Sequence, residues 1–262
     1  MNQQANLIRV VAGAVFNERG EVLLTSRPEG KPYAGYWEFA GGKVEENETG
    51  INALKREFAE ELGIHIHQAQ PWLVKVHAYE HALVYLRFYW VNAGDWSGEL
   101  QAKEGQQWSW QKVGEFTVEP MLPANTQLLK SLSIPREFAG DVNTGFVGKN
   151  AQGEFHIVPS AHAKPHHQGV FMTFAEWEQV QRVKPDNAFL FVLVQSDDER
   201  FMSENADALI WQVNDRVAAQ EAAQSLRTGV DVPVLVLANA DLVAEFGNEW
   251  REAGAHSVLV QH

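Results

Sequence analysis

Residues 42–64 of this chain read GKVEENETGINALKREFAEELGI. Thr49 is a preferred residue type at a helix N-cap, and Gly63 suits the position just past a helix C-terminus. Between them apolar residues recur at about 100° per residue, which is the pattern of one buried helix face. These residues are Ile51, Leu54, Phe58 and Leu62. The stretch therefore predicts an amphipathic helix over residues 50–62.

Acidic residues occupy a neighbouring face of the predicted helix. Glu57, Glu60 and Glu61 meet there because positions i, i+3 and i+4 are neighbours on a helix. Carboxylates this close repel one another, and clustered hard oxygen ligands are what Mg²⁺ or Mn²⁺ prefers. The pattern predicts a divalent-cation site, with an ordinary acidic surface as the alternative. Arg56 and Glu48 are placed to pair and to hold the preceding loop on the helix.

The spacing of the fixed residues in this stretch resembles the signature box of the Nudix hydrolases. The matching residues are Gly42, Glu48, Arg56, Glu57, Glu60, Glu61 and Gly63, with apolar Phe58 and Ile64. The resemblance implies an α/β fold whose N-terminal domain is a Nudix α/β/α sandwich with a mixed sheet. It also implies Mg²⁺-dependent, or Mn²⁺-dependent, hydrolysis of a nucleoside triphosphate to the monophosphate and pyrophosphate.

Further segments narrow the resemblance to the MutT-type branch, the 8-oxo-dGTP diphosphatases. Residues 37–43, WEFAGGK, are similar to that branch's LEFPGGK, although Ala40 replaces the usual Pro. Residues 103–106, KEGQ, match a loop that supplies an additional carboxylate, and residues 122–125, LPAN, resemble the segment whose Asn reads the purine edge. Pro32 falls where a relative has a phosphate-side His, and Lys31 is near enough to substitute. The resemblance covers about residues 6–132.

The resemblance also implies roles for individual residues. Metal ligands are expected from the carboxylates of Glu57, Glu60, Glu61 and Glu38 and from the Gly41 carbonyl. The catalytic group is expected to comprise Glu57, Glu104, Arg56 and Glu48, and whether Glu57 or Glu104 takes the proton stays open. Substrate contacts are expected from Arg27, Lys43, Phe39 and Asn125. Phe39 and Phe88 have a plain core role as their alternative, and Asn125 has helix capping as its alternative.

Composition excludes several classes of protein. The net charge of -13 argues against binding a nucleic-acid polymer by bulk electrostatics. The chain has no cysteine, so it has no disulfide or thiolate metal site, which fits a cytoplasmic protein. We expect no membrane segment and no signal peptide, because no apolar run approaches about 18 residues. The oligomeric state stays open.

The first domain is expected over residues 1–134. Residues 6–16 and 21–26 are expected to pair as a hairpin, because a turn-like NERG segment joins two apolar runs. Its other elements are expected to be a short strand within residues 34–42, strands near 71–79, 81–92 and 107–112, and a helix over 123–132. A boundary rich in Ser, Pro, Gly, Asp and Asn follows at residues 133–145.

The second domain, residues 135–262, is expected to be a smaller α/β domain of βα repeats with parallel strands. The expected elements are a hairpin of 146–148 and 155–158, strands at 189–194, 208–213, 232–237 and 256–260, and helices at 173–183, 216–226 and 242–253. Residues 232–260 weakly resemble the thiamine-phosphate-synthase-like domain fused to some MutT-type proteins. The domain is too short for a full eight-stranded barrel of about 250 residues. Its role stays open, and His162, His166 and His167 form a weak alternative metal site.

Three functions compete on this evidence. The first is removal of 8-oxo-dGTP from the nucleotide pool, with 8-oxo-dGMP and pyrophosphate as products. The second keeps the chemistry but acts on ADP-ribose, another dinucleotide or ordinary dNTPs. The third is a non-catalytic nucleotide-binding module, which the complete set of box carboxylates disfavours.

Overall fold

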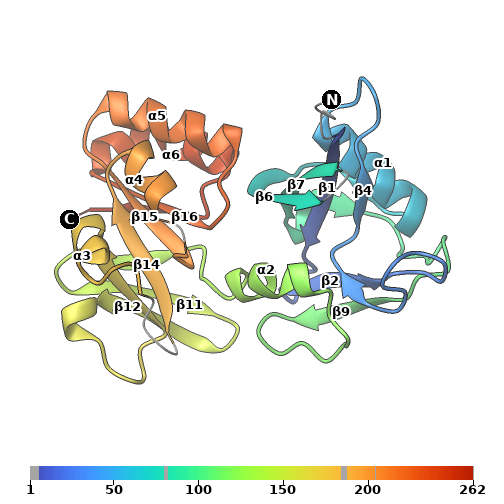
Figure 1. Cartoon of the computed structure of the whole chain (residues 1–262), viewed down its shortest axis with the longest axis horizontal. Helices are drawn as coiled ribbons and strands as arrows, with labels where there is room; N and C mark the ends of the chain where they lie inside the picture. The colour runs from blue at the N-terminus through green and yellow to red at the C-terminus, as the bar shows by residue number, and fades with distance from the viewer. Residues whose placement is uncertain (1–5, 80–81, 184–187, 204, 262) are drawn as a thin grey trace. The chain divides into compact units, whose positions relative to one another are not determined.

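The computed structural model describes residues 6–79, 82–183, 188–203 and 205–261. The chain divides into two compact units, Met1–Lys130 and Ser131–His262, which Figure 1 draws from blue to green and from green to red. The domain boundary expected after residue 134 lies just beyond this division.

The first unit is built on a mixed four-stranded sheet with the order β4-β1-β7-β6. Strand β1 (Asn6–Val15) runs parallel to β7 (Ala82–Val91) and antiparallel to β4 (Gly41–Lys43). Strand β6 (Gln70–Tyr79) pairs antiparallel with β7. The expected first residue of the 81–92 strand lies outside the described residues. The mixed sheet and the α/β class agree with the sequence prediction.

A second sheet of the first unit has the order β3-β2-β9. Its strands are β2 (Glu21–Ser26), β3 (Trp37–Glu38) and β9 (Trp108–Lys112). The predicted β1–β2 hairpin is wrong, because β4 and β7 already pair with the two edges of β1. Among the described residues, the antiparallel link between these segments is the isolated bridge of Phe16 with Val22, next to a hydrogen bond from the Asn17 N–H to the Glu21 carbonyl at 3.1 Å. The smaller elements of this unit are β5 (His65–Ile66), η1 (Ala93–Asp95), β8 (Trp96–Ser97), η2 (Pro123–Asn125) and α2 (Thr126–Ser131).

Helix α1 (Gly50–Leu62) has the bounds that its capping residues predict. The Thr49 side chain accepts from the Asn52 N–H at 3.3 Å, and Gly63 ends the helix with a φ of 69°. The buried face packs into one core cluster with β1 and β7. Gly13 of β1 makes this approach possible, since a Cβ there would lie 2.9 Å from the Phe58 ring. The packing holds α1 against β1, which pairs with β4, the strand that contains Gly41 and Gly42.

The second unit contains an eight-stranded sheet whose strands follow chain order from β10 to β17. The first two pairings are antiparallel, and the pairings from β12 onward are parallel. The strands are β10 (Phe138–Asp141), β11 (Gly145–Asn150), β12 (Gly153–Pro159), β13 (Gly169–Thr173), β14 (Phe189–Val194), β15 (Ala208–Val213), β16 (Val234–Ala238) and β17 (Ser257–Val260).

This sheet curves back on itself, because β10 also contacts β17. One apolar cluster draws side chains from β11 through β17 and fills the interior. The sheet has eight strands, but no ladder pairs β10 with β17 among the described residues, so the expectation that the domain is too short for a full eight-stranded barrel is not contradicted. Turns and loops, rather than long helices, join its first four strands. Its helices are α3 (Phe174–Gln179), α4 (Asp197–Met202), α5 (Arg216–Thr228) and α6 (Ala240–Ala253), and η3 (Ser160–His162) precedes β13.

Helix α3 is shorter than the predicted 173–183 helix. It begins with a capping box of Thr173 and Glu176. Gln181 and Arg182 have φ values of 53° and 59°, which a right-handed helix cannot contain.

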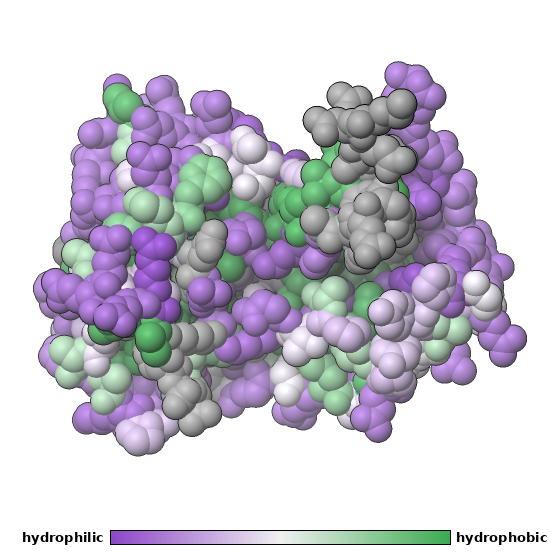
Figure 2. Space-filling model, in the orientation of Figure 1, coloured by the Kyte–Doolittle hydropathy of each residue, from purple (hydrophilic) through white to green (hydrophobic). Residues whose placement is uncertain are grey.

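The visible face of the molecule is mostly hydrophilic (Figure 2). Within the described part of the chain, no helix combines the length and apolar character that a bilayer crossing requires.

Candidate active site

Two glycines let β4 approach both β1 and α1 closely. Gly42 lies opposite Val11 in the antiparallel pairing of β4 with β1. Gly41 has a φ of 154°, and a Cβ there would overlap the Val11 carbonyl oxygen. A Cβ on Gly42 would overlap the carboxyl group of Glu57. The Glu57 carboxylate therefore lies directly against the backbone of β4, whose last residue, Lys43, is exposed.

Arg56 ties the loop before α1 to carboxylates on the helix. Its Nε and Nη2 donate to the two Glu48 oxygens at 3.1 and 3.0 Å, and Nη2 also donates to the Lys43 carbonyl at 3.0 Å. Its Nη1 donates to Glu57 at 2.9 Å and to Glu60 at 3.2 Å. Hydrogen bonds from Arg56 lower the pKa of Glu48. The structure thus contains the expected Arg56–Glu48 pair, and the same guanidinium group orients Glu57.

A second group of carboxylates gathers near the C-terminal end of α1. Lys31 Nζ lies 3.1 Å from Glu104 Oε2 and 3.8 Å from Glu61 Oε1. Burial, followed by the negative charges of Glu104, Glu57 and Glu38, raises the pKa of Glu61 to about 7 despite the opposing charge of Lys31. The four carboxylates are therefore electrostatic neighbours, although they come from β3, α1 and a distant loop.

The loop that carries Glu104 is fastened to the end of α1. Lys103 Nζ donates to the Ala59 carbonyl at 2.9 Å, and Gln106 Nε2 donates to the Glu61 carbonyl at 2.8 Å. The buried Gln106 side chain also accepts from the Glu104 backbone N–H at 2.9 Å. Lys103 and Gln106 therefore position Glu104 beside Glu61. The family resemblance assigns a role only to the glutamate of the KEGQ segment.

Arg27 and Glu38 bind each other in this structure. Arg27 Nη1 lies 2.8 Å from both carboxylate oxygens of Glu38, and its Nε donates to the Pro32 carbonyl at 2.7 Å. The antiparallel pairing of β2 with β3, which sets Ser26 opposite Trp37, brings the two residues together. Burial raises the pKa of Glu38, although the charge of Arg27 opposes the shift. Arg27, which is expected to contact phosphate, and Glu38, which is expected to bind metal, thus form an ion pair with each other.

The residues expected to contact the base lie beside the same strand. The Leu122 N–H donates to the Trp37 carbonyl at 2.9 Å, which brings the segment containing Asn125 next to β3. Asn125 ends the short helix η2 and is only 4% exposed. Phe39 is also buried, and its ring meets Phe88 edge to face with centroids 5.6 Å apart. The structure therefore places Phe39 and Phe88 in the core, which is the alternative that the sequence left open.

Comparisons with known proteins decide the family. The NUDIX domain model matches residues 6–132. Over 126 residues the chain is 38% identical to the 8-oxo-dGTP diphosphatase of Haemophilus influenzae. This alignment covers 48% of this chain and 91% of that protein. The chain belongs to the Nudix family. Over 125 residues it is also 38% identical to the CTP pyrophosphohydrolase of Escherichia coli, covering 48% of this chain and 90% of that protein. The solution structure of the E. coli ORF135 protein aligns with 48% of this chain and 87% of that chain, at 35% identity and a TM-score of 0.41.

The matched region contains the complete Nudix box and the KEGQ and LPAN segments. The prediction of a Nudix hydrolase with MutT-type relatives is confirmed. The sequence likeness of the second half to a thiamine-phosphate-synthase-like domain stays a prediction.

The donor set of the Nudix box suits a divalent cation, which Nudix hydrolases generally use. Burial and the charges of Glu104, Glu57 and Glu38 raise the pKa of Glu61, so a cation beside Glu61 would favour its charged form. Gly42 leaves room for the Glu57 carboxylate at the backbone. Among the described residues, however, no three His, Asp or Glu side chains are already arranged to hold a metal ion. Cationic side chains take up these carboxylates instead, with Arg56 on Glu57 and Glu60, Lys31 on Glu61 and Glu104, and Arg27 on Glu38. Arg27 and Lys31 therefore compete with a metal ion for Glu38, Glu61 and Glu104.

The histidine loop of the second unit does not form an alternative metal centre within the described residues. The rings of His166 and His167 lie 4.3 Å apart, and His167 Nδ1 accepts from the Lys164 backbone N–H at 3.1 Å. His156 pairs with Glu154 at 3.1 Å.

Proposed function

We propose that this Nudix hydrolase cleaves 8-oxo-dGTP to 8-oxo-dGMP and pyrophosphate with Mg²⁺, or Mn²⁺, as its cofactor. The observation that supports the metal most directly is the convergence of Glu104, Glu57 and Glu38 on Glu61, whose pKa is raised to about 7 by burial and then by these charges. A divalent cation held there would offset this charge and would supply Lewis-acid polarisation of the phosphate and activation of water. Residues 1–134 are the proposed hydrolase domain.

The chain's own residues take the remaining roles. Glu57, Glu60, Glu61, Glu38 and the Gly41 carbonyl would hold the cation, and Glu57 or Glu104 would accept a proton from the attacking water. Arg56 and Glu48 position Glu57 through the hydrogen bonds described above. Arg27 and Lys43 would offset phosphate charge. Such positioning and electrostatic stabilisation are the main contributions of a protein to phosphoryl transfer.

Asn125 is the proposed base-recognition residue. Its amide offers a donor and an acceptor, which together match the edge of a guanine-like base. The hydrogen bond between Leu122 and Trp37 holds its segment beside β3, whose residue Glu38 belongs to the carboxylate group. The identity of 38% to a diphosphatase that acts on 8-oxo-dGTP supports this substrate.

Hydrolysis of CTP is a second candidate. The chain is equally identical, at 38%, to the E. coli CTP pyrophosphohydrolase, which it covers to nearly the same extent. Asn125 could pair with a cytosine edge as well, because an amide supplies both hydrogen-bonding types.

A substrate panel with Mg²⁺ tests these proposals. Pyrophosphate release would be measured from 8-oxo-dGTP, dGTP, CTP and ADP-ribose. We expect the highest kcat/KM for 8-oxo-dGTP, and a preference for CTP or ADP-ribose would replace the substrate while keeping the chemistry. If none of the four substrates released pyrophosphate, the proposed hydrolase activity would be refuted.

Glu57→Gln isolates the metal site. We expect kcat to fall by roughly three orders of magnitude or more, because a neutral amide removes a ligand and a candidate base. Glu46→Gln is the matched control, since Glu46 is an exposed residue of the same box loop. Equal turnover in Glu57→Gln and the parent chain would remove the metal-site assignment.

A further inference from the structure

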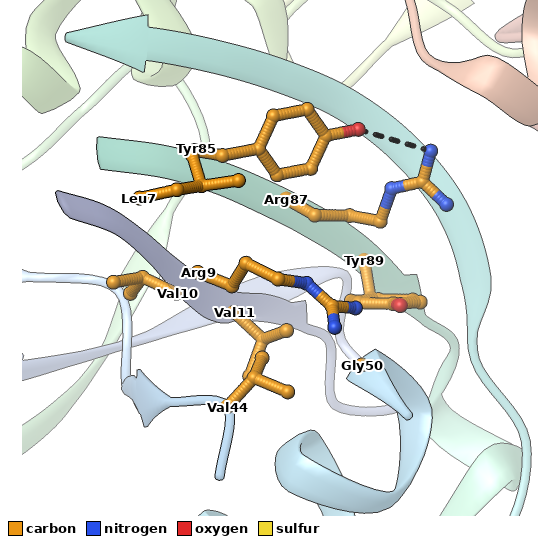
Figure 3. A pocket seen from close by; sticks show the side chains of 9 residues that line it. All are labelled: Leu7, Arg9, Val10, Val11, Val44, Gly50, Tyr85, Arg87 and Tyr89. Carbon is orange, nitrogen blue, oxygen red and sulfur yellow. Dashed lines mark hydrogen bonds between the residues drawn. The ribbon is translucent and has the colours of Figure 1, made fainter. Parts of the chain in front are cut away.

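A pocket of about 340 Å³ lies on the α1 side of the main sheet of the first unit (Figure 3). It forms because β1 and β7 are parallel, with Arg9 opposite Tyr85 and Val11 opposite Arg87. Alternate residues of a strand point to the same face, so Tyr89 joins Arg87 and Tyr85 on this side. Gly50, the first residue of α1, closes one end. None of the carboxylates of the Nudix box lines this pocket.

The pocket concentrates positive charge in an acidic chain. Arg9 and Arg87 both line it, and no acidic side chain is among its described lining residues. Figure 3 shows the Arg9 guanidinium group beside Tyr89 and the Arg87 side chain extending past the ring of Tyr85. Arg87 Nη2 donates to the Tyr85 hydroxyl at 3.4 Å. Such an arrangement offers several hydrogen-bond donors to one anion.

The helix end adds to this character. A Cβ on Gly50 would lie 2.5 Å from the Tyr89 hydroxyl oxygen, so the glycine lets that hydroxyl reach the first turn of α1. This first turn contains no acidic residue, although acidic residues are favoured at helix N-termini. The N-terminus of a helix attracts anions through its dipole and its free N–H groups. The helix end, the hydroxyl and the guanidinium groups therefore favour the same kind of ligand.

We propose that this pocket binds a small organic phosphate at a site separate from the catalytic centre. The guanidinium groups of Arg9 and Arg87 and the Tyr89 hydroxyl hold the phosphate group, because planar guanidinium forks match its oxygens. The aliphatic side chains of Leu7, Val11 and Val44 contact the apolar part of the ligand. The volume falls within the range of about 300–1,000 Å³ that is typical of small-molecule sites.

Calorimetry on the full chain tests the site with phenyl phosphate and inorganic phosphate as probes. EDTA is present throughout, so that no metal draws either anion to the Nudix box. We expect phenyl phosphate to bind more tightly than inorganic phosphate. Arg9→Gln and Arg87→Gln should each weaken phenyl phosphate binding by about tenfold or more, the usual effect of losing a charged hydrogen bond. Arg19→Gln is the matched control, because it removes an exposed arginine that pairs with Glu21 elsewhere.

Several outcomes would overturn the proposal. They are an unchanged affinity in both pocket variants, equal affinity for the two probes, or no heat at millimolar phenyl phosphate. Glu57→Gln should leave phenyl phosphate binding unchanged, and a large change would place the anion at the catalytic centre instead. Circular dichroism checks the fold of each variant, and Arg9→Gln decides the matter if Arg87→Gln does not fold, since Arg9 is exposed. The test does not depend on turnover, so it stands or falls separately from the proposed hydrolase.

Discussion

His256 of the second unit makes stability depend on pH. Its side chain is 1% exposed, and Nε2 donates to the Ile134 carbonyl at 2.9 Å. Burial and then the charge of Arg136 lower its pKa from 6.5 to about 3. Folding therefore keeps this imidazole neutral in acid that would protonate the unfolded chain.

The sign and size follow from the two pKa values. Above pH 6.5 both states hold a neutral His256, so its contribution to stability is fully present. As the pH falls from 6.5 towards 3, only the unfolded state takes up the proton, and stability is lost. Between pH 8 and pH 5 the loss from this group is about 2 kcal/mol, and it approaches about 5 kcal/mol below pH 3.

His256→Gln separates this effect from every other titration. Glutamine Nε2 keeps a donor for the Ile134 carbonyl but does not titrate in this range. Urea unfolding of both proteins would be followed at pH 8 and pH 5 by amide signals of the second unit. We expect the parent chain to lose about 2 kcal/mol more than the variant across this interval. Equal losses in the two proteins would refute the reasoning, because His256 would then have the same proton affinity folded and unfolded.

Two further predictions concern the active site. Gly42→Ala should lower kcat by about a hundredfold with nearly unchanged secondary structure. The added Cβ would push the Glu57 carboxylate aside, and a displacement of about 1 Å is enough for such a loss. Steady-state kinetics and circular dichroism measure the two effects, and full activity would contradict the close approach of Gly42 to Glu57. Lys31→Gln should strengthen Mg²⁺ binding, measured by calorimetry, by a few-fold. The exposed Lys31 ammonium group pairs with Glu61 and Glu104, and in the variant it no longer competes with Mg²⁺ for these carboxylates. Weaker Mg²⁺ binding in the variant would show that Lys31 supports the site instead.

The sequence predicted α1 and its carboxylates because the information is local. Capping by Thr49 and Gly63 sets the ends of the helix, and i, i+3 and i+4 spacing sets its faces. The positions of Glu38 and Glu104 relative to Glu61 are not local. They came only from the family resemblance, and the structure brings them together through β3 and the loop held by Gln106.

Strand pairing was the main failure. A turn between β1 and β2 favours a hairpin locally, but parallel pairing of β1 with β7 buries the apolar face under α1. For the same reason the sequence did not predict that β10 contacts β17 at the other end of the sheet. The pocket that contains Arg9 and Arg87 could not be predicted either. The two arginines are far apart in sequence and become neighbours only through the register of β1 and β7.

The ion pairs of the active site connect metal binding to phosphate binding. Arg27 and Lys31 now neutralise Glu38, Glu61 and Glu104. A divalent cation that binds these carboxylates would release the same two side chains. The family resemblance implies that Arg27 contacts phosphate, and Lys31 lies near enough to take the place of a phosphate-side histidine. We therefore expect Mg²⁺ and nucleotide to bind cooperatively, each raising the affinity of the other by the same factor. Calorimetric titration of each ligand in the presence and absence of the other, with a non-hydrolysable nucleotide, would measure that factor, and independent binding would show that the cations stay on their carboxylates.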